Sequence, residues 1–282
     1  MTELVVEFSS SAYLTDTQLS RLKRIPLFRS DTTVSDRTLG AIDACRNQGL
    51  HIAIATARPF ASVKRFLPES LHRDVPWICG SGGSVYENAV CLYQDLIDVE
   101  TAQAVVEVLY RADEDFIVSL DMAGRLYVNR PVEGVLTPHK VCDLRKIVTA
   151  PVAKFLVNAL DDLSSRMVPL GEISPAANIR LPALPAGCKV QVTDQGSRAN
   201  ILAPTVSKSH ALQFVLEQRG LDFGQVMAFG DDISDMDMLV QSAIGVAMAN
   251  AVAEILAIAD RVTASNDEDG VALVLEELVG QN

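Results

Sequence analysis

The sequence predicts an α/β protein whose core is a parallel sheet built from β/α units, interrupted by an inserted α+β domain. Short apolar runs alternate with amphipathic helical segments at both ends of the chain, over residues 1–85 and 199–282. Between them, residues 86–198 mix short extended and helical segments without that alternation. We therefore expect one discontinuous core domain, 1–85 and 199–282, and a separate domain over 86–198.

In the first core segment, helices and strands are predicted from the spacing of apolar residues and from the capping residues and glycines at their ends. Ser35 is a capping residue, Leu39, Ile42 and Cys45 follow at helical spacing, and Gly49 ends that helix. We predict a further short helix over 60–67, and one over 16–23 is an option within a segment without clear structure. Strands are predicted over 4–8, 50–55 and 75–79.

The remaining elements follow the same rules. In the insert we expect helices over 101–111 and 160–168 and strands over 116–120 and 126–128. From Asn200 the alternation resumes: Ser207 caps a helix that ends at Gly220, and Asn250 caps a helix to about residue 259. The other predicted elements are strands over 225–229, 244–248 and 261–263 and helices over 234–241 and 268–279.

Composition limits the classes of partner. The net charge of the 282 residues is −12, which disfavours a nucleic-acid backbone or an anionic membrane surface. The five cysteines are widely spaced, without a CxxC pair, which is typical of a reduced cytoplasmic protein. No basic segment precedes the first apolar run, and no run approaches membrane-span length. We expect a cytoplasmic protein that binds neither nucleic acid nor membrane.

The stretch 226–239 carries the strongest indication of chemistry. An apolar strand ends in Gly230 and a helix starts near Ser234, and three carboxylates, Asp231, Asp232 and Asp235, lie where the two meet. The carboxyl end of a parallel strand is where α/β folds bind ligands, and crowded carboxylates suit magnesium. The alternative is a solvated acidic helix start, which the helix dipole favours.

Two further positions suit an anion. Thr56 directly follows a buried strand, where its hydroxyl and backbone N–H can bind a phosphate oxygen; the alternative is a helix cap. Lys208 lies in the first turn of a helix, where the dipole disfavours a cation unless an anion is shared there; the alternative is an exposed lysine. The segment 80–85 lacks the last glycine of a dinucleotide loop and is expected to be a turn into the insert. The four histidines are scattered, which disfavours zinc.

Together these motifs resemble the haloacid dehalogenase superfamily, and most of all its Cof-type sugar-phosphate phosphatases. The resemblance is carried by Thr56-Ala57-Arg58-Pro59, by Lys208 in Val-Ser-Lys-Ser, by Gly230-Asp231-Asp232-Ile233-Ser234-Asp235, and by segments 245–251 and 263–271. It implies a Rossmann-like, doubly wound parallel sheet as the core, with an inserted cap domain. It also implies magnesium-dependent hydrolysis of phosphate monoesters. It also implies phosphate binding by Thr56, Ala57, Lys208 and Asn250, and a Mg²⁺ site at Asp231 and Asp235.

The chain departs from the family at its first motif, Asp-x-Asp-Gly-Thr, which is missing. The first strand would place Glu7 at the nucleophile and metal position and Ser9 at the acid position. Glu is one methylene longer than Asp, so the attacking oxygen would be misplaced, and Ser9 is no acid near neutral pH. A misplacement of about 1 Å can cost roughly a hundredfold in rate. Asp31 is the alternative, although its neighbours match the segment that follows the motif.

Two functions remain open from the sequence. The first is a magnesium-dependent phosphatase of small phosphate monoesters such as sugar phosphates, weakened by the altered first motif. The second is a non-catalytic protein that binds magnesium and a phosphorylated metabolite on the same scaffold. In either case the expected partner is a small phosphorylated metabolite, and the chain is expected to be a monomer or a homodimer.

Overall fold

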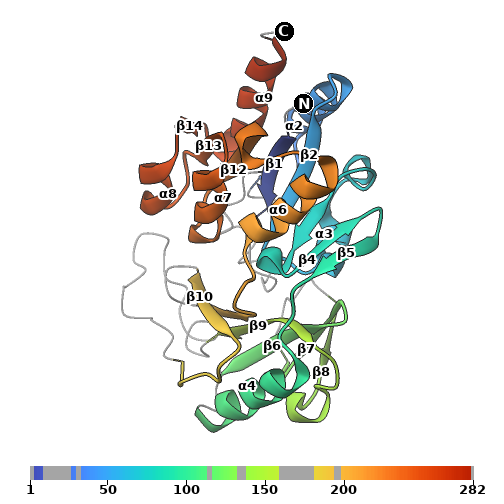
Figure 1. The fold of residues 1–282 in the computed structure, drawn as a ribbon, viewed down its shortest axis with the longest axis vertical. Helices are drawn as coiled ribbons and strands as arrows, with labels where there is room; N and C mark the ends of the chain where they lie inside the picture. Colours follow the sequence, from blue (N-terminus) through green and yellow to red (C-terminus); the bar gives the residue numbers. More distant parts are fainter. Residues whose placement is uncertain are drawn as a thin grey trace. The chain divides into compact units, whose positions relative to one another are not determined.

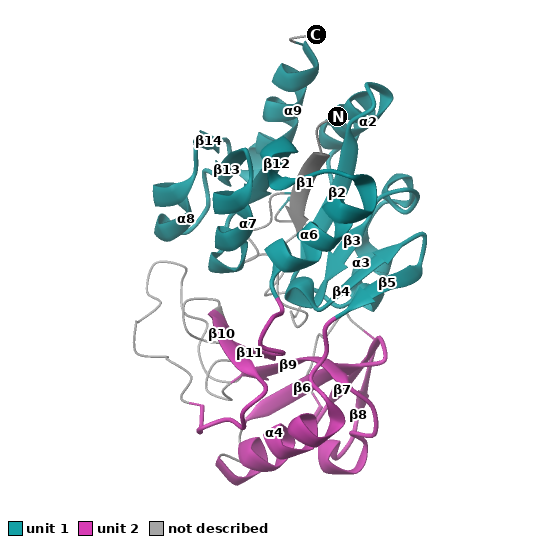
Figure 2. Ribbon diagram, viewed as in Figure 1, with its two compact units in different colours: residues 1–94, 207–282 teal, residues 95–206 magenta. Residues whose placement is uncertain are grey.

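A computed structural model describes residues 3–8, 27–29, 33–112, 116–131, 138–158, 181–193 and 198–280 (Figure 1). The chain divides into two compact units, which Figure 2 colours separately. The first unit comprises residues 1–94 and 207–282, and the second comprises residues 95–206. Within the described part of the chain, no helix is long and apolar enough to cross a membrane.

The first unit is built on an eight-stranded sheet in the order β14-β13-β12-β1-β2-β3-β4-β5. Neighbours from β14 to β3 are parallel, whereas β3, β4 and β5 pair antiparallel. The strands are β1 (Glu3–Phe8), β2 (His51–Thr56), β3 (Trp77–Cys79), β4 (Ser84–Glu87), β5 (Val90–Gln94), β12 (Val226–Gly230), β13 (Ile244–Met248) and β14 (Arg261–Thr263). The predicted parallel sheet is confirmed, and an antiparallel hairpin is added at one edge.

Helices pack on both faces of this sheet, which confirms the doubly wound architecture. Along β2, Ile52 and Ile54 belong to one apolar cluster and Ala53 and Ala55 to another, as alternation along a strand requires. The first cluster includes side chains of α2 (Asp36–Asn47), α3 (Phe60–Phe66) and α9 (Gly270–Gly280). The second includes side chains of α6 (Lys208–Arg219), α7 (Met236–Gln241) and α8 (Ala253–Ile258).

Short 3₁₀ helices connect these elements. They are η1 (Glu69–Leu71), η2 (Gly80–Gly82), η5 (Phe223–Gln225), η6 (Ile233–Asp235) and η7 (Asn266–Glu268). The predicted cap at Asn250 is wrong, because α8 has Val252 at its N-cap and no side-chain capping bond. Asn250 instead accepts a hydrogen bond from the backbone N–H of Asn266 at 3.2 Å.

The boundary of the second unit differs from the expected 86–198. Residues 84–94 form the β4–β5 hairpin and pair with the core sheet through β3, so they belong to the first unit. Asn88 and Ala89 at the tip both have positive φ, 50° and 64°. A two-residue hairpin turn of this kind usually has glycine at its second position. Because Ala89 stands there instead, the sequence does not indicate the turn. At the other end, residues 199–206 belong to the second unit.

The second unit is a six-stranded, mostly antiparallel sheet in the order β10-β11-β9-β6-β7-β8, with α4 packed on one face. Its elements are α4 (Val99–Ala112), β6 (Ile117–Met122), β7 (Arg125–Val128), β8 (His139–Val141), η3 (Leu144–Lys146), β9 (Val152–Asn158), β10 (Lys189–Thr193) and β11 (Arg198–Leu202). The expected helix over 160–168 lies outside the described residues. On β6 and β9, Asp121 and Lys154 are register partners, and both are buried.

Candidate active site

The ends of neighbouring parallel strands bring the predicted site residues to one edge of the first unit's sheet. β1 lies between β2 and β12, with Glu7 in register with Ala55 and Phe8 in register with Thr56. Asp231 directly follows Gly230, the last residue of β12. The backbone of Glu7, the side chain of Thr56 and that of Asp231 therefore share the carboxyl edge, where parallel sheets bind ligands.

The loop after β12 is organised by the Asp235 carboxylate. Its Oδ2 accepts hydrogen bonds from the backbone N–H groups of Asp231, at 3.1 Å, and Asp232, at 3.0 Å. A Cβ at Gly230 would lie 2.7 Å from the Cβ of Asp235, so a glycine is needed for this close approach. Asp231 and Asp235 are both fully buried. A solvated acidic helix start, the alternative for this stretch, is therefore wrong for these two residues.

Lys208 is a buried cation that contacts the loop after β12. Only 1 % of it is exposed, and its Nζ donates to Asp235 Oδ1 at 2.5 Å and to Ser234 Oγ at 3.1 Å. Ser207 caps its helix by accepting from His210 N at 3.0 Å, as the sequence predicts. The alternative interpretation from the sequence, that Lys208 is an exposed lysine, is therefore wrong. Asp235 holds both the loop after β12 and the ammonium group at the start of α6.

Thr56 ends β2 as a fully buried side chain. Its Oγ1 accepts from the backbone N–H of Arg58 at 3.0 Å, a local turn rather than a helix cap, since the N-cap of α3 is Pro59. A hydroxyl that accepts one bond still has a proton to donate. The Arg58 side chain is buried, with its guanidinium 5.2 Å from the ring centroid of Phe66. Burial lowers the pKa of Arg58 to about 10, so it is a cation at neutral pH.

The other expected residues have different positions in the structure. Ala57 is nearly buried beside Thr56. Asn250 follows β13, which neighbours β12, so it comes from the same edge of the sheet. Glu7 lies on described backbone whose side-chain placement is not described, and Ser9 and Asp31 lie outside the described residues. Their predicted roles stay predictions.

The carboxylates of Asp231 and Asp235 are donors of the kind that suits magnesium, and hydrogen bonds already use much of the Asp235 carboxylate. Carboxylate oxygens are the ligands that magnesium prefers, and Asp231 presents one at a strand end. A carboxylate has about four lone-pair positions, and three of those on Asp235 accept from Lys208, Asp231 N and Asp232 N. Among the residues described, no group of three or more His, Cys, Asp or Glu side chains could hold a metal ion. The metal-binding role of Glu7, whose side chain is not described, stays a prediction.

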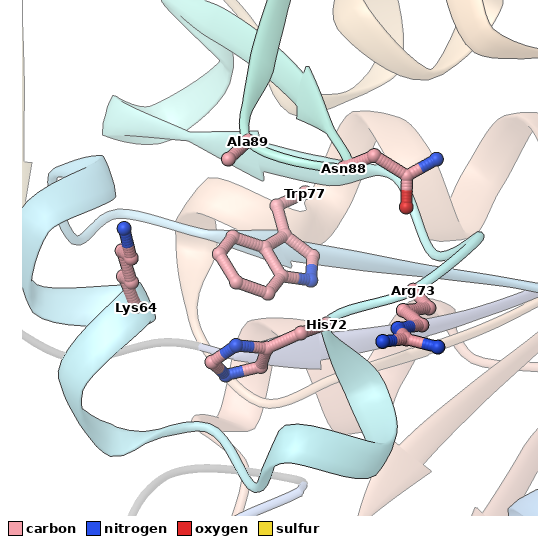
Figure 3. A pocket seen from close by; sticks show the side chains of 6 residues that line it. All are labelled: Lys64, His72, Arg73, Trp77, Asn88 and Ala89. Atoms are coloured by element: carbon pink, nitrogen blue, oxygen red, sulfur yellow. The ribbon is translucent and has the colours of Figure 1, made fainter.

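A surface cavity of about 270 Å³ lies elsewhere in the first unit (Figure 3). Its lining residues come from α3, the segment after η1, β3 and the β4–β5 turn, and they include none of the predicted site residues. They are Lys64, His72, Arg73, Trp77, Asn88 and Ala89. This cavity plays no part in the chemistry inferred below.

Reasoning from the sequence missed two residues of this edge. Ser234 accepts a hydrogen bond from the ammonium of Lys208. Arg58, a buried cation two residues after Thr56, donates its backbone N–H to the Thr56 hydroxyl. Ser234 had been considered only as a helix start. Arg58 was part of the motif after β2 without an assigned role, although a charged residue two positions beyond a buried strand could have indicated one.

Comparisons with known proteins agree with this architecture. The stress response protein YhaX of Bacillus subtilis is 28% identical over 269 residues, covering 89% of each chain. The 5-amino-6-(5-phospho-D-ribitylamino)uracil phosphatase YitU of the same organism is 25% identical, covering 89% of this chain and 93% of its own. A solved haloacid dehalogenase-like hydrolase from B. subtilis has a TM-score of 0.76 at 18% identity, covering 99% and 100%. The subclass IIB sugar phosphatase BT4131 has a TM-score of 0.71 at 20% identity, covering 99% of each chain.

The family match bears directly on the predicted resemblance. The sequence model of the haloacid dehalogenase-like hydrolases matches residues 26–275. The match includes Thr56, Lys208, Asp231 and Asp235 and begins after the strand that carries Glu7. With most of the chain matched and the fold shared, this protein belongs to the haloacid dehalogenase-like hydrolases.

Proposed function

We propose that this protein hydrolyses small phosphate monoesters, sugar phosphates among them, with magnesium at the carboxyl edge of its first unit. The observation that carries the proposal is the buried ammonium of Lys208, held by Asp235 at the edge where Thr56 and Asp231 also lie. A buried lysine next to a hydroxyl suits an anion such as phosphate. Two similar proteins, YitU and BT4131, are phosphatases, which supports the proposal.

Each side chain has a defined task in this proposal. The Thr56 hydroxyl, the Ala57 backbone N–H and the Lys208 ammonium bind phosphate oxygens, with Asn250 nearby on the neighbouring strand end. Asp231 holds the metal together with Glu7, and Asp235 orients Lys208 and offers a remaining lone pair. Bound magnesium would neutralise charge on the phosphoryl oxygens.

The first motif sets the expected rate. With Glu7 at the nucleophile position, the longer side chain carries the attacking oxygen past its ideal place. Ser9 at the acid position provides no proton for the leaving oxygen, a contribution typically worth a factor of about 10² to 10⁴. Phosphate binding does not depend on either defect, so we expect ordinary binding with slow turnover.

A second function is favoured by one observation, the missing Asp-x-Asp-Gly-Thr motif. If Glu7 and Ser9 support no chemistry, the same edge makes a non-catalytic binding protein for magnesium and a phosphorylated metabolite. The two functions differ in turnover and share binding, so the assay must measure both.

The test is release of inorganic phosphate from a panel of sugar phosphates and an aryl phosphate, with magnesium and with a chelator. The phosphatase proposal expects magnesium-dependent release that Lys208→Met abolishes and that the exposed Lys64→Met leaves unchanged. Phosphate and magnesium binding without any release would support the non-catalytic function. Neither binding nor release would refute both.

The expected roles of the second unit and of assembly stay proposals. We propose that residues 95–206 act as a cap that contributes to substrate selection, as their insertion between the two segments of the first unit suggests. The chain is proposed to act as a monomer or homodimer on a small phosphorylated metabolite.

A further inference from the structure

Ser81, in the middle of η2, has an unusual backbone conformation. Its φ and ψ are 63° and 23°, in the left-handed region, between Gly80 at φ 61° and Gly82 at φ 102°. A side chain with a Cβ is strained in that region, whereas glycine adopts it without penalty. Serine at this position therefore costs folding free energy that a third glycine would avoid. Strained residues of this kind cluster at functional sites.

The hydroxyl of Ser81 adds a second cost. Only 3 % of the residue is exposed, and its Oγ has no hydrogen-bond partner among the described residues. A buried polar group without a partner is destabilising, and in native proteins it calls for an explanation such as a ligand. Glycine at position 81 would remove both the backbone strain and the buried hydroxyl without a partner. Packing therefore does not explain why serine stands there.

The position of η2 supplies the explanation. On one side, Gly80 N donates to the carbonyl of Arg58 at 2.8 Å, which ties η2 to the turn that follows Thr56. On the other side, a Cβ at Gly82 would lie 2.1 Å from the carbonyl oxygen of Ser207 and 2.9 Å from Lys208 N. Ser81 is thus held between the two segments that supply the proposed phosphate-binding groups.

We propose that the Ser81 hydroxyl is a further phosphate-binding group of this site and donates a hydrogen bond to a non-bridging oxygen of the bound phosphate. The inference rests on the proposed function, since it requires that the edge of the first unit binds phosphate. The left-handed backbone at Ser81 holds the hydroxyl between Thr56 and Lys208 at the expense of stability.

Three substitutions at Ser81 separate the hydroxyl from the strain. Ser81→Ala keeps the Cβ and removes the hydroxyl, Ser81→Gly removes both, and Ser81→Asn restores a donor in a residue that tolerates the left-handed region. The measurements are the Kd of orthophosphate by calorimetry in the presence of magnesium, the KM for an aryl phosphate, and the melting temperature. Ser242→Ala is the matched control, because Ser242 is buried in the same unit and its Oγ donates to the Met238 carbonyl at 2.8 Å.

A lost hydrogen bond to a charged group should weaken orthophosphate binding by roughly 10- to 100-fold in Ser81→Ala and Ser81→Gly. Their melting temperatures should stay unchanged or rise, most in Ser81→Gly, and Ser81→Asn should recover part of the affinity. Ser242→Ala should show the opposite pattern, a lower melting temperature with unchanged affinity.

An unchanged Kd in Ser81→Gly would overturn the inference. Weakened binding accompanied by a lower melting temperature in both Ser81→Ala and Ser81→Gly, without recovery in Ser81→Asn, would also overturn it, because the hydroxyl would then be structural. A parent protein that binds no orthophosphate would instead refute the proposed function, and the inference would fail with it.

Discussion

Replacing Lys208 by methionine should destabilise the first unit by about 3 kcal/mol. Lys208 and Asp235 are 1% and 0% exposed, and their charged atoms lie 2.5 Å apart. Removing one partner of a buried ion pair typically costs about 3–5 kcal/mol, because the remaining charge stays buried without compensation. Asp235 keeps its bonds from Asp231 N and Asp232 N, so we expect the lower end of that range.

The assay is urea unfolding followed by tryptophan fluorescence. The chain has a single tryptophan, Trp77, which is buried in the core of the first unit and therefore reports on that unit. The control is Arg261→Met, which breaks the exposed Arg261–Glu277 pair and should cost less than about 1 kcal/mol. The double variant Lys208→Met/Asp235→Asn should lose less than the sum of the two single losses, because no unpaired charge remains.

Two results would refute this reasoning. A loss below about 1 kcal/mol for Lys208→Met would mean that the ammonium is not a buried partner of Asp235. Strict additivity of Lys208→Met and Asp235→Asn, within about 0.5 kcal/mol, would mean that the two side chains do not interact directly.

Three further outcomes are expected. Burial raises the pKa of Asp121 in the second unit to about 6. The stability that the protonated carboxyl contributes below about pH 4 should therefore be lost as the pH rises through 6, by up to about 3 kcal/mol. Asp121→Asn should abolish this decline, and melting temperatures that follow the same profile from pH 4 to 7 in parent and variant would contradict the prediction. Gly230→Ala should lower the melting temperature and weaken magnesium binding, because the Cβ of the new alanine would collide with Asp235. A magnesium affinity by calorimetry and a melting temperature that both equal those of the parent would argue against that close approach. Restoring fast turnover should need Glu7→Asp and Ser9→Asp together, because attack and leaving-group protonation act as a unit; turnover of an aryl phosphate that survives Glu7→Ala would point to another carboxylate.

The alternation of the core elements and the edge that carries the site could be predicted from the sequence. Lys208 was predicted to be functional because a cation at a helix start opposes the dipole, and the structure shows it buried and paired. Its partner Asp235 is 27 residues away, and no local pattern links the two. A role for Lys208 could therefore be predicted from the sequence, whereas its ion pair with Asp235 could be found only in the tertiary structure.

Other features escaped prediction for conformational reasons. Most of the β4–β5 hairpin fell in the predicted insert, because the alternation of strands and helices breaks near residue 86. Its turn was not predicted, since Ala89, at positive φ, stands where glycine would indicate one. Ser81 was included in a turn without a role, because a left-handed serine has no signature in sequence. In both cases the backbone adopts a conformation that the residue type disfavours, and propensity reasoning fails at such positions.

The most direct test of the central claim is magnesium-dependent release of phosphate from an aryl phosphate by the parent protein and by Asp231→Asn. The account expects slow release by the parent that requires magnesium, together with magnesium binding that calorimetry detects. In Asp231→Asn both should be lost or greatly weakened, although thermal unfolding should show a folded protein. Magnesium affinity and phosphate release that are the same in Asp231→Asn as in the parent would contradict the assignment of this strand end as the metal site.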